Sequence, residues 1–170
     1  RMIWACKDAP AIPFIRVPDA TEGAIQKATD IGALGIIVPM VDTAEKMENA
    51  VKYAKYPPMG RRSQGGGQYG ALWGRDYRQA ANANVMIIAM IETPEGVAVA
   101  DEIAGVDGVD IVFIASSDLG SFTGRRQGDP GPASPGLPVQ DSHRVRLDGA
   151  HRRPGAGRQR AQRSERVDHH

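Results

Sequence analysis

The feature that most constrains the fold is an alternation of short, continuous apolar runs with segments of helical period. The apolar runs are 11–17, 34–41, 85–91 and 109–115. Strands that lack polar alternation are buried on both faces, as in parallel sheets. Helical patterns follow the first three runs, at 19–32, at 42–58 and from Thr93 to about Ala104. The pattern predicts an α/β fold with a parallel sheet covered on both faces by helices.

Polar residues mark where the predicted helices begin. Asp19 is placed to cap the helix over 19–32. Asp42 and Glu45 have the spacing of a capping box for the helix over 42–58. Thr93 and Pro94 supply a cap and a first-turn proline for the third helix. These signals support the division of residues 1–124 into βα units.

The composition changes at residue 125. Residues 125–170 contain ten Arg, five acids and no Ile, Met, Phe, Trp, Tyr or Lys, whereas residues 1–124 carry a net charge of −4. Too few apolar residues remain in 125–170 to offset the entropy of ordering, so this tail is predicted to be disordered. Two explanations stay open: a native basic tail, or a frameshifted translation of a GC-rich gene from about residue 131.

The cysteine content and the hydropathy of the chain limit the cellular locations in which we expect the protein. The chain has one cysteine, Cys6, which excludes an internal disulfide framework and favours a reducing cytoplasm. No apolar run approaches the length of a membrane span, and the first residues lack the order of a signal peptide. We therefore expect a cytoplasmic protein with no membrane partner.

Three charged residues stand where predicted strands end. Glu92 and Asp118 follow consecutive strands and are 26 residues apart, about one βα unit. The carboxyl ends of neighbouring parallel strands lie at one edge of a sheet, where two carboxylates can hold Mg²⁺ or Mn²⁺. Alternatively, Glu92 serves only the helix that follows, and Asp118 caps the next turn. Arg16 is at the end of a third strand. Its side chain either faces the same site or forms a structural ion pair.

Three stretches together resemble the 4-hydroxy-2-oxoheptanedioate / 2-dehydro-3-deoxyglucarate aldolase family. They are "IPFIRVPD", "GIIVPMVDTAEKMENAVKYAKYPPMGRRSQGGG" and "MIETPEGVAVADEIAGVDGVDIVFIASSDLG". The resemblance covers residues 11–124 in order and implies a metal-dependent pyruvate aldolase with a (β/α)8 TIM barrel. Such a barrel has about 250 residues. We therefore expect about four βα units (strands three to six) in residues 1–124, as a fragment truncated at its N-terminus.

The resemblance also implies roles for individual residues. Glu92 and Asp118 would be ligands of Mg²⁺ or Mn²⁺, with Co²⁺ as a further candidate. Arg16 would contact the keto oxygen and stabilise the enolate. The backbone N–H groups around Ser116 and Ser117 would hold the substrate carboxylate. The implied enzyme is a homo-oligomer that cleaves 4-hydroxy-2-oxo acids to pyruvate or hydroxypyruvate plus an aldehyde, in aromatic or sugar-acid catabolism.

The sequence also departs from the family pattern. Met90 stands where many members carry glutamine two positions before the metal-binding glutamate. The family's catalytic histidine would precede residue 1. The glycine-rich segment 60–74 matches a loop beside the site and lacks the ending of a phosphate-binding loop. It is interpreted either as a cover for the substrate or as a plain flexible connection.

Two other functions remain open. A lyase of the same superfamily acting on acyl-CoA thioesters, of the citramalyl-, malyl- or citryl-CoA type, would carry the same metal carboxylates. The ten arginines of the tail could instead bind nucleic-acid phosphates on an inactive fragment. No aromatic residue is interleaved with those arginines, and the remainder of the chain is acidic. A small-molecule 2-oxo acid is therefore the favoured partner, and nucleic acid is not.

Overall fold

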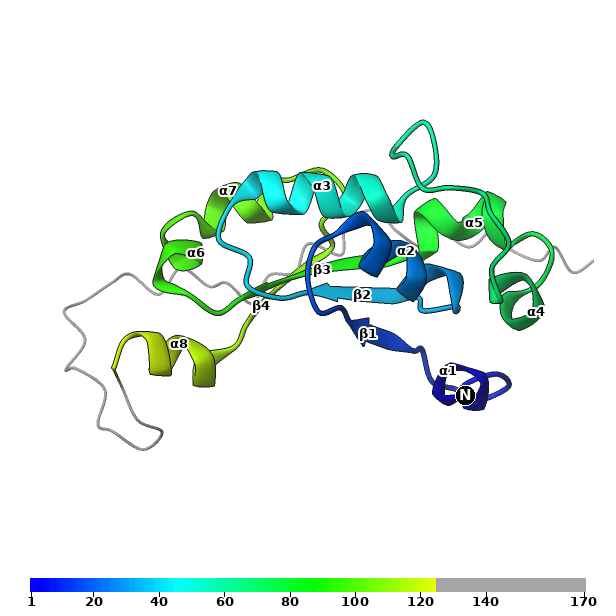
Figure 1. Cartoon of the computed structure of the whole chain (residues 1–170), viewed down its shortest axis with the longest axis horizontal. Helices are drawn as coiled ribbons and strands as arrows, with labels where there is room; N and C mark the ends of the chain where they lie inside the picture. Colours follow the sequence, from blue (N-terminus) through cyan, green and yellow to red (C-terminus); the bar gives the residue numbers. More distant parts are fainter. Residues whose placement is uncertain (125–170) are drawn as a thin grey trace, which may run out of the picture. The chain divides into compact units, whose positions relative to one another are not determined.

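The computed structural model describes residues 1–124, and the tail over 125–170, with its two explanations, lies outside the described residues. The elements in chain order are α1 (Met2–Ala5), β1 (Phe14–Arg16), α2 (Glu22–Asp30), β2 (Gly35–Val38), α3 (Ala44–Ala54), α4 (Tyr69–Trp73), α5 (Tyr77–Asn84), β3 (Met86–Ile91), α6 (Pro94–Ala98), α7 (Ala100–Ala104), β4 (Ile111–Ile114) and α8 (Ser116–Phe122). The four strands form one parallel sheet in the order β1-β2-β3-β4 (Figure 1). All four predicted strands are confirmed.

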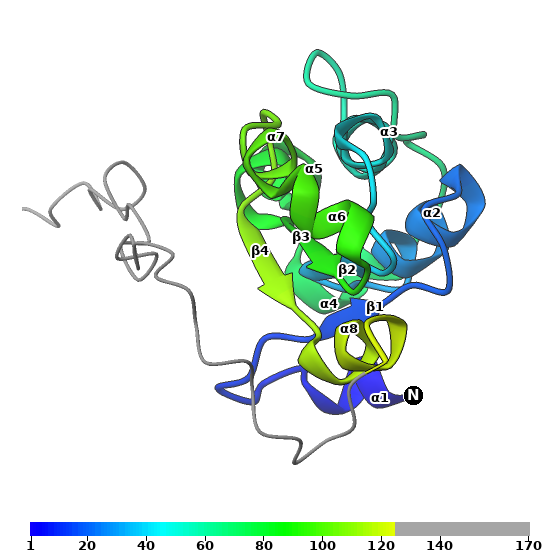
Figure 2. The same cartoon turned by 90° about the vertical axis from the view of Figure 1, so that its left-hand side faces the viewer.

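Helices α2, α3 and α7 pack on one face of the sheet (Figures 1 and 2). The core between these layers contains Ile36 and Val38 of β2, Ile87 of β3, Met47 of α3 and Ile103 of α7, none of which is exposed. Continuous apolar strands can bury this face because alternate side chains point toward the helices. None of the helices in the described part of the chain, residues 1–124, has the length and hydropathy of a membrane-spanning segment.

The second face of the sheet is open, so the prediction of helices on both faces is wrong for residues 1–124. Phe14, Met86, Ile111 and Phe113 are 42%, 40%, 41% and 50% exposed. The parallel register and the alternation of side chains put these four residues on one face. A sheet with helices on one face and apolar side chains on the other is the wall of a (β/α)8 barrel, whose inner face is filled by side chains. The predicted barrel-type fold with four βα units is confirmed in this form.

We expect the open face of the sheet to bind an apolar fluorescent dye. We expect the chain to enhance the fluorescence of 1-anilinonaphthalene-8-sulfonate, because four large apolar side chains meet solvent together. Phe113→Ser should lower this enhancement and change the free energy of unfolding little, since the side chain is half exposed. A dye titration of the unsubstituted chain and of Phe113→Ser tests this. Equal fluorescence enhancement in the two proteins, or none in either, would contradict an exposed apolar face.

Threonines, not the predicted aspartates, cap α2 and α3. Thr21 accepts a hydrogen bond from the Ala24 N–H, and Thr43 accepts one from the Lys46 N–H. Asp19 lies two residues before the cap and accepts hydrogen bonds from the hydroxyl and the N–H of Thr21, which lower the pKa of the Asp19 carboxyl. The third cap, Thr93, is confirmed by the hydrogen bond from the Gly96 N–H to its hydroxyl oxygen.

Candidate functional site

Glu92 follows the last residue of β3 and is tied to the neighbouring strand's loop. Its side chain is buried, at 5% exposure, and its Oε2 accepts a hydrogen bond of 2.6 Å from the N–H of Met40, just after β2. The N-terminus of α6 is capped by Thr93 instead. The alternative that Glu92 serves only the following helix is therefore not supported, because its hydrogen bond runs across the sheet.

Asp118 lies beyond the adjacent strand, β4. The N–H of Ala115 donates to Ile91 O at 2.9 Å, which continues the β3–β4 ladder to the residue before Glu92. Helix α8 begins at Ser116, and Asp118 is in its first turn, so both carboxylates follow paired strands at the C-terminal end of the sheet. Asp118, Ser116 and Ser117 are all exposed. Asp118 makes no capping hydrogen bond at α8, but as an acid in the first turn it can still interact favourably with the helix N-terminus, so both interpretations of Asp118 stay open.

Arg16 is the last residue of β1 and lies at the sheet edge. It is opposite Ile37 in the register, and Ile37 is opposite Ile88, which places Arg16 on the open face of the sheet. Its side chain is exposed and makes no ion pair within residues 1–124. The structural ion pair offered as an alternative for Arg16 is thus not found among the described residues.

The chemistry of Glu92 and Asp118 fits a hard divalent cation. Glu92 Oε2 has a hydrogen-bond partner within residues 1–124, and Oε1 has none among these residues. No group of three or more His, Cys, Asp or Glu side chains that could hold a metal occurs in the described part of the chain. A two-carboxylate site leaves positions for water or substrate, as Mg²⁺ commonly requires.

The glycine-rich segment 60–74 lies at the opposite end of the sheet, so the prediction that it lies beside the site is wrong. The Gln68 N–H donates to Asp30 O at 2.6 Å, and Trp73 Nε1 donates to Gly32 O at 2.8 Å. Asp30 ends α2, and Gly32 precedes β2, so these contacts are at the N-terminal ends of the strands. In barrel enzymes the chemistry is at the C-terminal ends.

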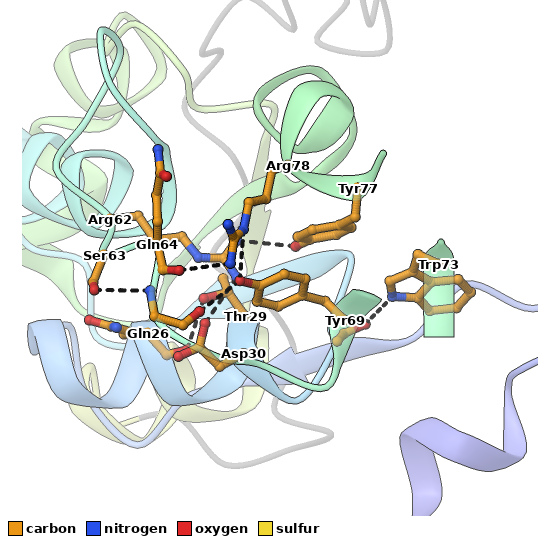
Figure 3. A network of polar contacts seen from close by, with 12 residues as sticks. Gln26, Thr29, Asp30, Arg62, Ser63, Gln64, Tyr69, Trp73, Tyr77 and Arg78 are labelled. Atoms are coloured by element: carbon orange, nitrogen blue, oxygen red, sulfur yellow. Dashed lines mark hydrogen bonds and ion pairs between the residues drawn. The ribbon is translucent and has the colours of Figure 1, made fainter. Parts of the chain in front are cut away.

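The segment is also no plain connection, because Arg62 anchors it in a buried cluster (Figure 3). Arg62 is 2% exposed, and its Nη2 donates to Asp30 Oδ1 and its Nη1 to the Tyr77 hydroxyl, both at 3.1 Å. Its guanidinium lies 4.6 Å from the ring centre of Tyr56 and 5.1 Å from that of Tyr69. Burial raises the pKa of the Tyr77 hydroxyl. Local sequence carries no signal for this cluster, because its members come from four separate segments.

Gly96 allows α6 to pack closely on the loop after β2. A Cβ on Gly96 would lie 2.3 Å from the Val41 carbonyl oxygen, a backbone atom that cannot move aside alone. We expect Gly96→Ala to lower the free energy of unfolding by about 2 kcal/mol. In α2, a Cβ on Gly23 would meet nothing within 4 Å, so Gly23→Ala should raise the same quantity by about 0.5 kcal/mol. Urea unfolding measures both; equal shifts would contradict the close approach at Gly96.

Residues 1–132 match the family model described as HpcH/HpaI aldolase/citrate lyase. The chain is 40% identical over 117 residues to a 4-hydroxy-2-oxovalerate aldolase of Novosphingobium aromaticivorans, covering 68% of this chain and 44% of that protein. It is 37% identical over 144 residues to a hydroxypyruvate/pyruvate aldolase of Pseudomonas aeruginosa, covering 82% and 53%.

A solved structure supports the same assignment. An HpcH/HpaI aldolase/citrate lyase family protein from Burkholderia cenocepacia J2315 superimposes with a TM-score of 0.68 at 31% identity, covering 75% of this chain and 52% of that one. The chain spans about half the length of the curated relatives it matches. Its parallel four-stranded sheet, with helices on one face, agrees with these matches. The chain therefore belongs to the HpcH/HpaI aldolase/citrate lyase family.

Proposed function

We propose that this chain is part of a divalent-metal-dependent aldolase. The reaction is the reversible cleavage of a 4-hydroxy-2-oxo acid to pyruvate or hydroxypyruvate plus an aldehyde. The observation that carries the proposal is the buried Glu92, whose Oε2 accepts a hydrogen bond from the Met40 N–H, beside the strand end that leads to Asp118. Relatives named as 4-hydroxy-2-oxovalerate and hydroxypyruvate/pyruvate aldolases support the substrate class.

Each residue of the site has a distinct role in this proposal. Glu92 and Asp118 would hold Mg²⁺, Mn²⁺ or Co²⁺, and a bound divalent cation supplies Lewis-acid polarisation of the keto oxygen. The Arg16 guanidinium donates hydrogen bonds to the same oxygen and stabilises the enolate charge that develops as the C–C bond breaks. The N–H groups around Ser116 and Ser117 bind the substrate carboxylate. Residues 1–124 contain no histidine, so a histidine base for the hydroxyl proton would have to come from outside them.

Assembly and location follow from the same proposal. A homo-oligomer is supported by the family resemblance, and a cytoplasmic location by the single cysteine, Cys6. Membership of a family that includes citrate lyase keeps acyl-CoA cleavage as the second candidate, because the same carboxylates would serve it. The two candidates differ in whether the chain acts on free 2-oxo acids or on CoA thioesters.

Pyruvate release from a 4-hydroxy-2-oxo acid tests the proposal. Any release is expected to require added Mn²⁺, Mg²⁺ or Co²⁺ and to stop in EDTA. Release that persists in EDTA would contradict the metal, and cleavage of citramalyl-CoA without cleavage of the free acid would favour the second candidate. Mn²⁺ binding by the same chain, followed by electron paramagnetic resonance, distinguishes a lost metal site from a site that binds metal without turnover.

A further inference from the structure

We propose that Lys46 is a positioning residue for Glu92 and acts through the backbone of Met40. This inference rests on the proposed function, because it concerns how a metal-binding carboxylate is oriented. The three residues come from three places: Met40 from the loop after β2, Lys46 from α3, and Glu92 from the end of β3.

The backbone of Met40 has an unusual conformation that must be held in place. Its φ is +51°, and Met40 and Asp8 are the two non-glycine residues with positive φ among residues 1–124. This left-handed conformation is unfavourable for an L-residue, because its Cβ comes too close to the following carbonyl oxygen. The Met40 side chain is 39% exposed, so burial of that side chain is not what compensates the cost. Strain of this kind persists where surrounding contacts fix it, and it clusters at functional sites.

Two hydrogen bonds fix Met40, one to each of its backbone polar groups. Its N–H donates to Glu92 Oε2, and its C=O accepts a hydrogen bond from Lys46 Nζ. Lys46 is well placed for this because it lies in the first turn of α3, where its own N–H donates to the capping Thr43. Helix α3 therefore fixes the backbone of Lys46 near the loop after β2, and the Lys46 ammonium group contacts the Met40 carbonyl.

The arrangement has a consequence for Glu92 as a ligand. One carboxylate oxygen is fixed by a backbone donor, so the other is directed by the same contact. The Lys46 ammonium group donates a hydrogen bond to the Met40 carbonyl, and its Nζ lies 3.8 Å from Asp42 Oδ1. Lys46 forms no ion pair with Glu92 among the described residues. Glu92 is thus oriented by a neutral N–H donor, and the Lys46 ammonium group is not its partner. Partners that orient a metal ligand in this way typically change metal affinity by about 10–100-fold.

The experiment compares Lys46→Met with Lys27→Met in the 170-residue chain. Lys27 is an exposed lysine on α2 that makes no hydrogen bond or ion pair among the described residues, so it controls for loss of charge. Mn²⁺ affinity is measured by electron paramagnetic resonance, and exchange of the Met40 amide by hydrogen–deuterium exchange without metal. We expect Lys46→Met to weaken Mn²⁺ binding about 10-fold and to speed Met40 exchange, and Lys27→Met to do neither.

A second variant tests whether backbone strain is what Lys46 opposes. Glycine adopts positive φ without penalty, so Lys46→Met should weaken Mn²⁺ binding less in a Met40→Gly background. Equal Met40 exchange and equal Mn²⁺ affinity in the two lysine variants would overturn the inference while the metal site stands. Absence of Mn²⁺ binding in the parent chain would refute the proposed metal site, and with it the role of Lys46. Unchanged exchange in the remainder of α3 shows that Lys46→Met still folds.

Discussion

Glu92→Gln is expected to weaken Mn²⁺ binding at least about 100-fold, because it removes the charge of a buried ligand while keeping its shape. The amide oxygen of glutamine can still accept the Met40 hydrogen bond, so the loop after β2 keeps its anchor. Any metal-dependent pyruvate release should fall with the metal affinity. Titration of Mn²⁺ by electron paramagnetic resonance measures the first effect directly, whether or not the chain turns over substrate.

Glu95→Gln is the matched control for that prediction. Glu95 is an exposed acid in the first turn of α6, three residues beyond Glu92, where it interacts favourably with the helix N-terminus. Its neutralisation should leave Mn²⁺ affinity unchanged and lower the free energy of unfolding by at most about 0.5 kcal/mol. If both variants bound Mn²⁺ like the parent chain, Glu92 would be no ligand. If both weakened binding equally, general negative charge at this end of the sheet would explain the effect.

Arg62→Ala is expected to lower the free energy of unfolding by about 3 kcal/mol, the largest stability effect we predict. The substitution removes a buried guanidinium whose side chain is 0% exposed and leaves a cavity among three tyrosine rings. It also leaves Asp30 without its partner, although Asp30 retains 23% exposure and therefore some hydration. Urea denaturation followed by tryptophan fluorescence reports the loss, since Trp73 lies in the anchored segment.

Arg61→Ala is the control next to it in the chain. Arg61 pairs with Glu22 at 2.9 Å, and both side chains are exposed, at 57% and 41%. Exposed pairs of this kind contribute at most about 1 kcal/mol, and less in salt. A large loss for Arg62→Ala with a small one for Arg61→Ala would show that burial, not charge number, makes segment 60–74 part of the core. Equal small losses would contradict the anchoring role of Arg62.

Local pattern was sufficient to predict the strands and two of the helices. The apolar runs over 34–41 and 85–91 contain β2 and β3. A strand with apolar residues on both of its faces is typical of a parallel sheet, whose strands are buried. The third helix was predicted as one element to about Ala104, but it breaks into α6 and α7 at Val99, whose φ of −116° and ψ of 22° are not helical. A single residue's backbone angles depend on packing that periodicity does not record.

The capping aspartates show a second limit of local reasoning. Asp19 and Thr21 are both good capping residues, as are Asp42 and Thr43. Sequence alone does not rank two good caps placed one or two residues apart. In the structure the caps are Thr21 and Thr43, whose hydroxyl oxygens accept hydrogen bonds from the N–H groups three residues further on.

The sequence by itself determined the α/β class, the parallel strands and the candidate ligands Glu92 and Asp118, because apolar runs and residues at strand ends are local features. Only the tertiary structure decided that one face of the sheet is open and that segment 60–74 lies at the end away from Glu92. Only it showed the links from Lys46 to Met40 and from Met40 to Glu92. Those contacts join residues six and 52 positions apart across different elements, and no local pattern specifies which distant groups will meet.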